Sequence, residues 1–108
     1  MNELKEKHCV PCSEGTNPLN SKEIEHFKEK VDNDWQVIDD KAIRREFSFE
    51  NFNRGMAFAQ NVAELANKED HHPDLCVHYK SVDVELSTHK IGGLSANDFI
   101  LAAKIDEI

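Results

Sequence analysis

Apolar residues recur at helical spacing in several stretches of the chain. The first stretch begins after Asn20, whose side chain can cap a helix while Glu23 returns a hydrogen bond. A second covers residues 50–67, and a third follows Ser95, which can form the same kind of capping box with Asp98. We predict helices here and expect one apolar stripe of the second to face the core. That stripe consists of Phe52, Met56, Ala59, Ala63 and Ala66, with Val62 beside it.

Between these stretches, apolar and polar residues alternate as they do in strands. Residues 35–37 and 43–49 alternate on either side of a turn at Asp39-Asp40-Lys41, and residues 75–80 and 82–88 follow the second helical stretch. Because these strands come as hairpins rather than crossovers, they predict one antiparallel sheet. The order α-β-β-α-β-β-α therefore predicts an α+β fold, a two-layer sandwich in which helices pack on one face of a four-stranded antiparallel sheet.

Residues 1–18 show no apolar periodicity and contain several turn-forming residues. We therefore divide the chain into an irregular N-terminal arm, residues 1–18, and a single domain, residues 19–108. The arm holds Cys9-Val10-Pro11-Cys12, a CxxC spacing that could bind zinc or do redox chemistry. Only His8 lies nearby as a further ligand, and no strand precedes the motif. The pattern favours a packing or tethering role and leaves metal or redox chemistry open.

The charge balance excludes some classes of partner. The 108 residues include 13 Lys or Arg and 21 Asp or Glu, a formal net charge of −8. Non-specific binding to nucleic acid or to an anionic membrane needs a basic face, so we expect neither partner. No apolar run approaches the ~20 residues that span a bilayer, and the charged start lacks the apolar core of a signal peptide. We expect a cytoplasmic protein without a disulfide framework, since it has 3 cysteines.

Histidines concentrate between residues 71 and 89. His71 and His72 stand where Pro73 ends the second predicted helix, and His89 follows the last predicted strand. Imidazole exchanges protons near neutral pH, so two rings on opposite sides of a small molecule could act as acid and base. The same residues could be structural, or could bind a metal with Cys76 and His78, although adjacent histidines tend to diverge. From the residues alone these three interpretations stay open.

A longer ordered pattern surrounds the histidines. It consists of Asp70-His71-His72-Pro73, Tyr79, Val82, Leu86-Ser87-Thr88-His89, Gly93-Leu94, Asp98 and Leu101-Ala102. This series resembles the signature of pterin-4a-carbinolamine dehydratases, and the resemblance extends back through residues 47–52. The arm resembles that of bacterial-type members. Two positions depart from the pattern: Asn67, where members often carry an acidic residue, and Leu75, where an aromatic residue is frequent.

The resemblance implies a reaction, the dehydration of 4a-hydroxytetrahydropterin (4a-hydroxytetrahydrobiopterin) to quinonoid dihydropterin in tetrahydropterin recycling. It implies no metal and no redox cofactor, because the step needs only an acid and a base. The catalytic residues would be His71, His72 and His89, with His71 and His89 as the acid/base pair and His72 holding the pterin. The substrate-binding residues would be Asp70, His71, His72, Ser87, Thr88, His89 and Lys90. For Asp98 we favour the structural role of a helix cap.

Association with further copies is also expected. Members of the family that the chain resembles form dimers through sheet and helix contacts, and some form tetramers through the terminal helix. The last predicted helix carries more apolar residues than one stripe needs, namely Phe99, Ile100, Leu101, Ile105 and Ile108. We therefore expect a homodimer at least, or a homotetramer. The resemblance leaves two alternatives to pterin recycling: a protein-interaction module that acts as a dimerisation cofactor, and a pterin-related role in molybdenum cofactor metabolism.

Overall fold

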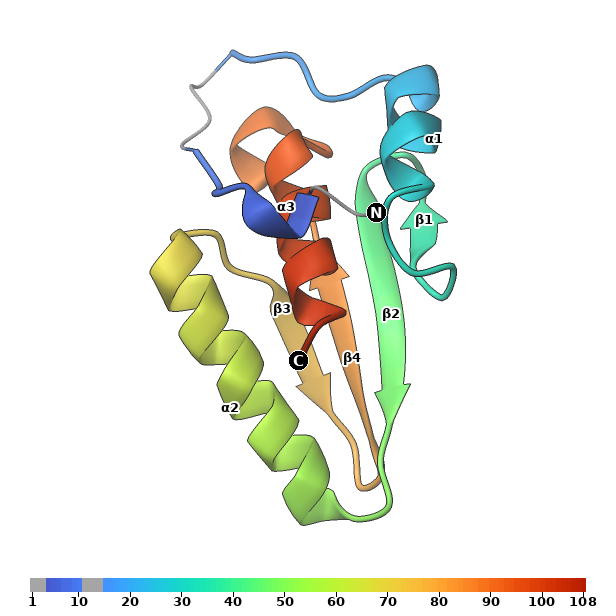
Figure 1. Ribbon diagram of the computed structural model, residues 1–108. Helices are drawn as coiled ribbons and strands as arrows, with labels where there is room; N and C mark the ends of the chain where they lie inside the picture. The colour runs from blue at the N-terminus through green and yellow to red at the C-terminus, as the bar shows by residue number, and fades with distance from the viewer. Residues whose placement is uncertain (1–3, 11–14) are drawn as a thin grey trace.

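The computed structural model describes residues 4–10 and 15–108, which form an α+β fold (Figure 1). The elements follow the predicted order α-β-β-α-β-β-α, with two short 3-10 helices added. They are η1 (Leu4–Glu6), α1 (Ser21–Lys28), β1 (Gln36–Ile38), β2 (Ala42–Ser48), α2 (Phe52–Glu69), β3 (Asp74–Val77), β4 (Ser81–Leu86), η2 (His89–Ile91) and α3 (Ala96–Ile105). Among the described residues, no helix has the length and apolar character needed to cross a membrane.

The four strands form one antiparallel sheet in the order β1-β2-β4-β3. The two hairpins meet along β2 and β4, where Ile43 pairs with Leu86 and Phe47 with Val82. The turn between β1 and β2 places Asp39 and Asp40 at φ values of 51° and 56°, in the left-handed region that aspartate tolerates better than most residues. Because β1 and β3 stand at the two ends of the strand order, they are the edges of the sheet.

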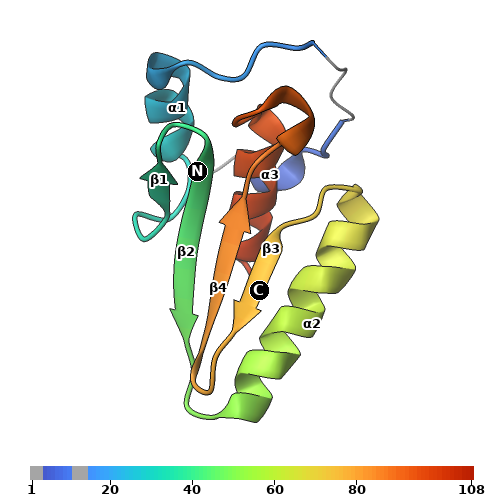
Figure 2. The same cartoon turned by 180° about the vertical axis from the view of Figure 1, so that it is seen from behind.

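One face of the sheet is covered by helices and the other is open. Along β4, Val82 and Val84 are fully buried while Asp83 between them is partly exposed. Such alternation marks a sheet with one solvated face. In Figure 1 α3 lies in front of the sheet, and in Figure 2, seen from behind, the sheet lies in front of α3. The predicted arrangement of helices on one face is confirmed.

The buried face of α2 differs from the predicted stripe. Phe52 and Met56 are 43% and 44% exposed, whereas Phe58 is buried. The ring of Phe58 packs against Phe47 and Phe49, with centroid distances of 4.5 and 5.1 Å. These aromatic contacts orient α2 so that the side bearing Phe52 and Met56 turns away from the core. The residues of α2 that face the core are Gly55, Phe58, Ala59, Val62, Ala66 and Glu69.

The last helix also differs from expectation, because its apolar residues are already covered within one chain. Phe99, Leu101 and Ile105 are 1% exposed or less, and Ile100 is 5% exposed. The arm supplies part of this cover, since η1 packs against α3 and buries Leu4 (Figure 1). The prediction that the last helix exposes apolar residues for contact with a second copy is therefore wrong. Among the residues named for that contact, only Ile108 is half-exposed.

Candidate active site

The residues that the sequence pattern assigns to a site line one pocket. Its volume is about 300 Å³, at the lower end of the range for small-molecule sites. The expected residues that line it are Asp70, His71, His72, Ser87, Thr88, His89 and Lys90. Val10 and Asn97 line it as well, and neither was expected. The pocket therefore joins the end of α2, the end of β4, η2, the start of α3 and the arm.

The end of α2 aims His71 into this pocket. Asp70 caps the helix in the left-handed conformation, with φ 53° and ψ 40°. The following N–H, that of His71, donates to the carbonyl of Ala66 at 3.2 Å and closes the helix end. Pro73 cannot continue a helix, so the chain turns at once into β3. A reversal within so few residues places His71 beside the start of α3.

A buried carboxylate holds the His71 ring. Nε2 of His71 lies 2.6 Å from Oδ1 of Asp98, which is fully buried. The other carboxylate oxygen accepts hydrogen bonds from Thr88 Oγ1 at 2.8 Å and from the Ser95 N–H at 3.0 Å. Asp98 completes the predicted capping box with Ser95. The cap is confirmed, but Asp98 is at the same time the partner of His71, which our structural interpretation of this residue missed.

His72 and His89 lie in more exposed positions around the same pocket. His72 Nε2 donates to Asn67 Oδ1 at 3.0 Å, so the position that departs from the family pattern holds this ring with a neutral amide. His89 opens η2, and Gly92 caps the end of this element with φ 71°. The next residue, Gly93, has no room for a side chain, because a Cβ there would lie 2.8 Å from Cβ of Pro18. The loop that carries His89 is thereby fixed against the segment before α1.

The sequence left open that all these histidines bind one metal ion together with Cys76. The geometry does not support this interpretation. Cys76 and His78 lie on β3 and just after it, and neither lines the pocket of His71, His72 and His89. His78 instead contacts Asp83, at 3.1 Å between Nε2 and Oδ2. A single ion could therefore not take ligands from both groups without moving the sheet.

The arm closes one side of the pocket through contacts that the sequence did not indicate. The Cys9 N–H donates to Glu69 Oε1 and the Val10 N–H to Asn97 Oδ1, both at 2.9 Å. Lys104 Nζ lies 3.6 Å from the other carboxylate oxygen, Glu69 Oε2. Glu69 and Asn97 immediately precede Asp70-His71 and Asp98 in the chain. The arm thus binds to the two segments that carry the histidine and its carboxylate.

The pKa values of two groups at this contact differ from their ordinary values. Burial, with the charges of Glu69 and Asp98, raises the pKa of the Cys9 thiol to about 12, so the thiol stays protonated near neutral pH. Burial opposes ionisation of Glu69, but the Cys9 N–H, His8 and Lys104 together hold its pKa below the usual 4.5. A buried, protonated Cys9 thiol therefore favours the packing role of the arm over metal binding or redox chemistry. Cys12 lies outside the described residues, so chemistry of the cysteine pair stays a prediction.

Removing the charge of Glu69 should release the arm. In Glu69→Gln the charge-assisted hydrogen bonds are lost, and such bonds contribute about 1.5–3 kcal/mol each. We expect faster amide hydrogen exchange at Cys9 and Val10. Since the folded-state pKa of Glu69 is lowered, its stabilising effect is present above pH 4.5 and disappears as the pH falls through the lower folded value. Glu64→Gln, an exposed position on the same helix, is the matched control; equal exchange in the two variants would contradict the docking role.

Fold and pocket together define a small α+β protein whose candidate site is lined by histidines, one of them paired with a buried carboxylate. The family model described as pterin 4 alpha carbinolamine dehydratase matches residues 17–108. A putative pterin-4-alpha-carbinolamine dehydratase of Alkaliphilus metalliredigens is 46% identical over 99% of this chain and 96% of its own length. One of Rubrobacter xylanophilus is 42% identical over the full length of both. The chain belongs to the pterin-4a-carbinolamine dehydratase family.

One solved structure supports this assignment, and a second shares the fold. A transcriptional coactivator/pterin dehydratase from Brucella melitensis is similar with a TM-score of 0.78 and 35% identity, over 84% of this chain and 97% of its own. A pterin dehydratase-like protein, described as a RuBisCO assembly factor in the alpha-carboxysome, has a TM-score of 0.56 and 19% identity, over 68% of this chain and 83% of its own. The second likeness concerns the fold alone.

Proposed function

We propose that this protein dehydrates 4a-hydroxytetrahydropterin to quinonoid dihydropterin by acid/base catalysis with its pocket histidines, as a step of tetrahydropterin recycling. The observation that carries the proposal is the 2.6 Å contact of His71 with buried Asp98 in a pocket that His89 also lines. Membership of the family names the class of substrate. The paired ring and the second histidine supply the groups that the loss of water needs.

The contact with Asp98 favours one division of roles. A carboxylate oxygen only accepts, so the hydrogen on His71 lies on Nε2, and Nδ1 is left with the lone pair of a base. His71 would take the proton from N5 of the pterin, and Asp98 would stabilise the imidazolium that results. His89, in its protonated form, would give a proton to the C4a hydroxyl as the C–O bond breaks. Water leaves, the C4a–N5 double bond forms, and solvent restores both histidines.

The remaining pocket residues would hold the substrate. We assign pterin binding to His72, together with Asp70, Ser87, Thr88 and Lys90. Thr88 Oγ1 is already occupied by Asp98 and by Ser95 Oγ, both at 2.8 Å, so its contribution to binding falls to its backbone or methyl group. Lys90 and His72 are exposed and can adjust to the ring. His72 would therefore act on affinity more than on rate.

The direct test follows the decay of freshly generated 4a-hydroxytetrahydropterin by stopped flow, with and without the protein. A decay that accelerates in proportion to protein concentration supports the proposal. A decay unchanged at protein concentrations comparable to the substrate would refute it. Because the uncatalysed dehydration is itself assisted by buffer acids and bases, each rate is compared with that of the same buffer containing a heat-denatured sample.

Catalysis should not depend on a metal ion. The proposed step moves two protons and changes no oxidation state, so histidine side chains suffice. After dialysis against a strong chelator, we expect the dehydration rate to remain within the error of the untreated protein. Loss of activity together with stoichiometric zinc or iron, and its recovery on adding that metal back, would contradict the proposed mechanism.

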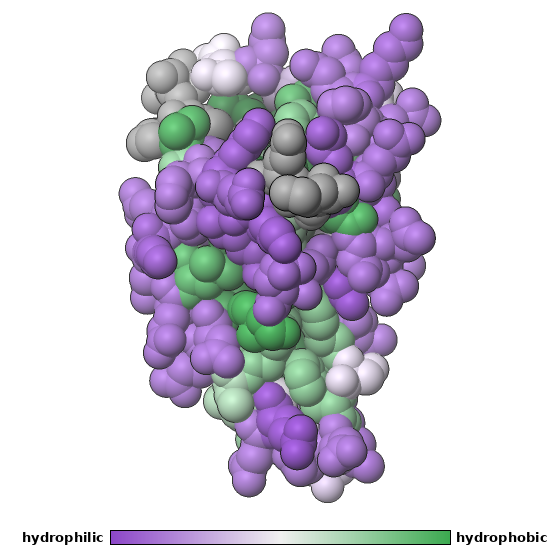
Figure 3. All heavy atoms as spheres, viewed as in Figure 1, coloured by the Kyte–Doolittle hydropathy of each residue, from purple (hydrophilic) through white to green (hydrophobic). Residues whose placement is uncertain are grey.

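We also propose that the protein associates with itself, through α2 and the expected sheet edge rather than through the apolar surplus expected on the last helix. Exposed apolar side chains on α2 and along the β3 edge are Phe52, Met56, Leu75, Val77 and Tyr79. Figure 3 shows apolar side chains gathered between α2 and the end of α3. There, a hollow of about 410 Å³ is lined in part by Phe47, Phe49 and Ile108. A surface of this character is typical of contacts between proteins, and β3 adds the unpaired backbone groups of an edge strand.

A charge placed on this surface should weaken association more than folding. Met56 is 44% exposed, so Met56→Glu should lower the sedimentation coefficient toward that of a monomer while the unfolding midpoint changes little. Asn61→Glu is the matched control, because the helical period places residue 61 on another side of α2. A wild-type chain that sediments as a monomer at micromolar concentration would contradict self-association. The Brucella relative is also described as a coactivator, so a monomer here would direct attention to a different protein partner.

A further inference from the structure

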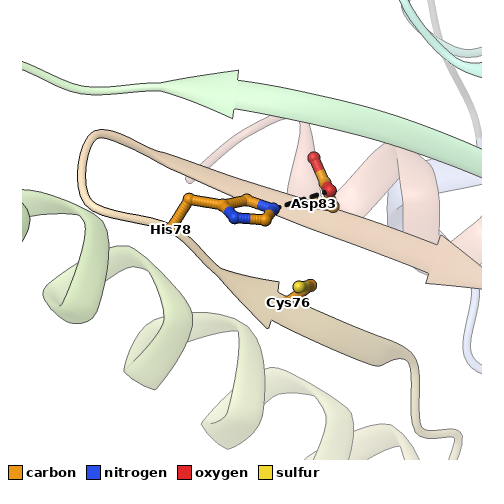
Figure 4. Close-up of side chains that lie close together, drawn as sticks. All are labelled: Cys76, His78 and Asp83. Carbon is orange, nitrogen blue, oxygen red and sulfur yellow. Dashed lines mark hydrogen bonds and ion pairs between the residues drawn. The ribbon is translucent and has the colours of Figure 1, made fainter.

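A second cluster of reactive side chains lies on the open face of the sheet, away from the pocket. It consists of Cys76 on β3, His78 just after β3, and Asp83 on β4 (Figure 4). One ligand atom from each of the three residues lies within 4.8 Å of the other two. None of the three lines the candidate active site, so the acid/base chemistry proposed above does not use them.

The register of the β3–β4 hairpin brings these side chains together. Cys76 pairs directly with Asp83 across the two strands, and side chains of directly opposed residues point to the same face. Residues two apart on a strand also share a face, which places His78 beside Cys76. The His78 N–H donates to the Ser81 carbonyl at 2.8 Å and fixes the end of the hairpin. The backbone thus holds the three residues in place before any ligand arrives.

We infer that Cys76, His78 and Asp83 form a binding site for a divalent transition-metal ion, with zinc as the best match. Thiolate sulfur, imidazole nitrogen and carboxylate oxygen are the donors that zinc takes in proteins, usually four in a tetrahedron. Three ligands from the chain leave one position for water. Calcium and magnesium prefer sites made of oxygen alone, so the sulfur and nitrogen donors argue against them.

The surroundings of the cluster favour a cation. Glu46 on β2 stands directly opposite Asp83 on its other side, and Glu85 follows two residues later on the same face. Arg44 is the opposing charge nearby; it stands opposite Glu85 in the strand register and lines the same hollow as Cys76 and Asp83. The Cys76 side of the face opens into a hollow of about 260 Å³, so an ion and its water have access from solvent.

Binding would exchange protons for the ion. The Cys76 thiol must lose its proton to ligate, and His78 must present a nitrogen lone pair in place of its present hydrogen bond to Asp83. The ion would then link β3 to β4 through side chains as well as through the backbone. Because only the folded hairpin brings these ligands together, bound ion should raise the stability of the fold.

Titration of the full-length, reduced, metal-free protein tests the inference, with zinc followed by calorimetry and cobalt by its thiolate charge-transfer absorption. We expect one ion per chain and a cobalt–thiolate band. In Cys76→Ser the band should vanish. In Cys76→Ser and in Asp83→Asn the affinity for zinc should fall about 10²-fold. Even the loss of a residue that only hydrogen-bonds to a metal ligand can lower metal affinity by this much. These residues are partly exposed, so circular dichroism should show the wild-type fold.

Cys12→Ser is the control that separates this cluster from the CxxC motif of the arm, and it should keep both band and affinity. A band that survives in Cys76→Ser and is lost in Cys12→Ser would overturn the inference, as would one ion shared between two chains. Cys76→Ser should also dehydrate pterin at the wild-type rate. Since the titration does not use activity, failure of the metal site and failure of the proposed function are distinguishable.

Discussion

His71→Ala and His89→Ala should each slow dehydration by about 10²-fold or more, the usual scale of general acid–base assistance. In the first variant N5 of the pterin loses the base that Asp98 orients. In the second the departing hydroxyl loses its proton donor. The loss should appear in kcat under stopped-flow conditions with substrate in excess. Buffer-assisted dehydration sets a floor to the measurable rate, so low buffer concentrations reveal the effect most clearly.

His72→Ala is the matched variant, because it removes a neighbouring imidazole from the same pocket. Its hydrogen bond to Asn67 is exposed, and its loss should leave the fold intact. We expect a higher KM with kcat nearly unchanged. Equal and small effects in all three histidine variants would contradict both the assigned pair and the assigned holder of the pterin.

Asp98→Ala should be the most destabilising single change around the site. It leaves the Thr88 hydroxyl, the Ser95 N–H and the His71 ring without their common acceptor in a fully buried position. Unsatisfied buried donors and a lost helix cap together should lower the free energy of unfolding by about 2–4 kcal/mol. Chemical denaturation measures this change. A loss within the range of ordinary surface substitutions would show that the Asp98 contacts are weak.

Asp98→Asn separates the structural role of this residue from its role toward His71. The amide has nearly the same shape, and its oxygen can still accept from Ser95 and Thr88. Its NH2 group would then face His71 as a donor and force Nε2 to accept, which moves the ring hydrogen to Nδ1. We expect a fold close to wild type, a kcat reduced by ~10²-fold or more, and an altered pH–rate profile. A stable variant with wild-type kcat and profile would show that Asp98 does not set the state of His71.

Features specified by nearby residues could be predicted from the sequence. The cap of α1 by Asn20 with Glu23 forms as expected, and so does the box of Ser95 with Asp98. Both hairpins form because strand alternation and turn residues act within a few positions of each other. The order of elements follows from these local signals. Grouping of the expected site residues in one pocket was reached through the resemblance to a family rather than from the residues alone.

Features that depend on contacts between distant segments could not be predicted. Phe52 and Phe58 lie on different sides of α2, and periodicity alone cannot say which side meets Phe47 and Phe49 on the sheet. The cover of α3 by the arm likewise joins segments near opposite ends of the sequence. Val10 reaches the pocket only through that docking, in which its N–H donates to Asn97. Asp98 belongs to the family pattern, which could have indicated a role in the site. Its role as a helix cap already explained the residue, so its contact with His71 was not predicted.

The shared use of Asp98 has a consequence for how the sequence can vary over evolutionary time. At the third position of most helices, glutamate and glutamine cap as well as aspartate or better. Here the carboxylate is fully buried between Thr88, Ser95 and His71, so an added methylene would force these groups apart. A substitution of aspartate by glutamate is neutral in the cap of many helices. At position 98 it would displace the His71 ring, which we propose to be catalytic. Selection for a stable α3 and selection for the proposed reaction therefore both act on the Asp98 carboxylate. A substitution of Asp98 would have to satisfy both requirements at once.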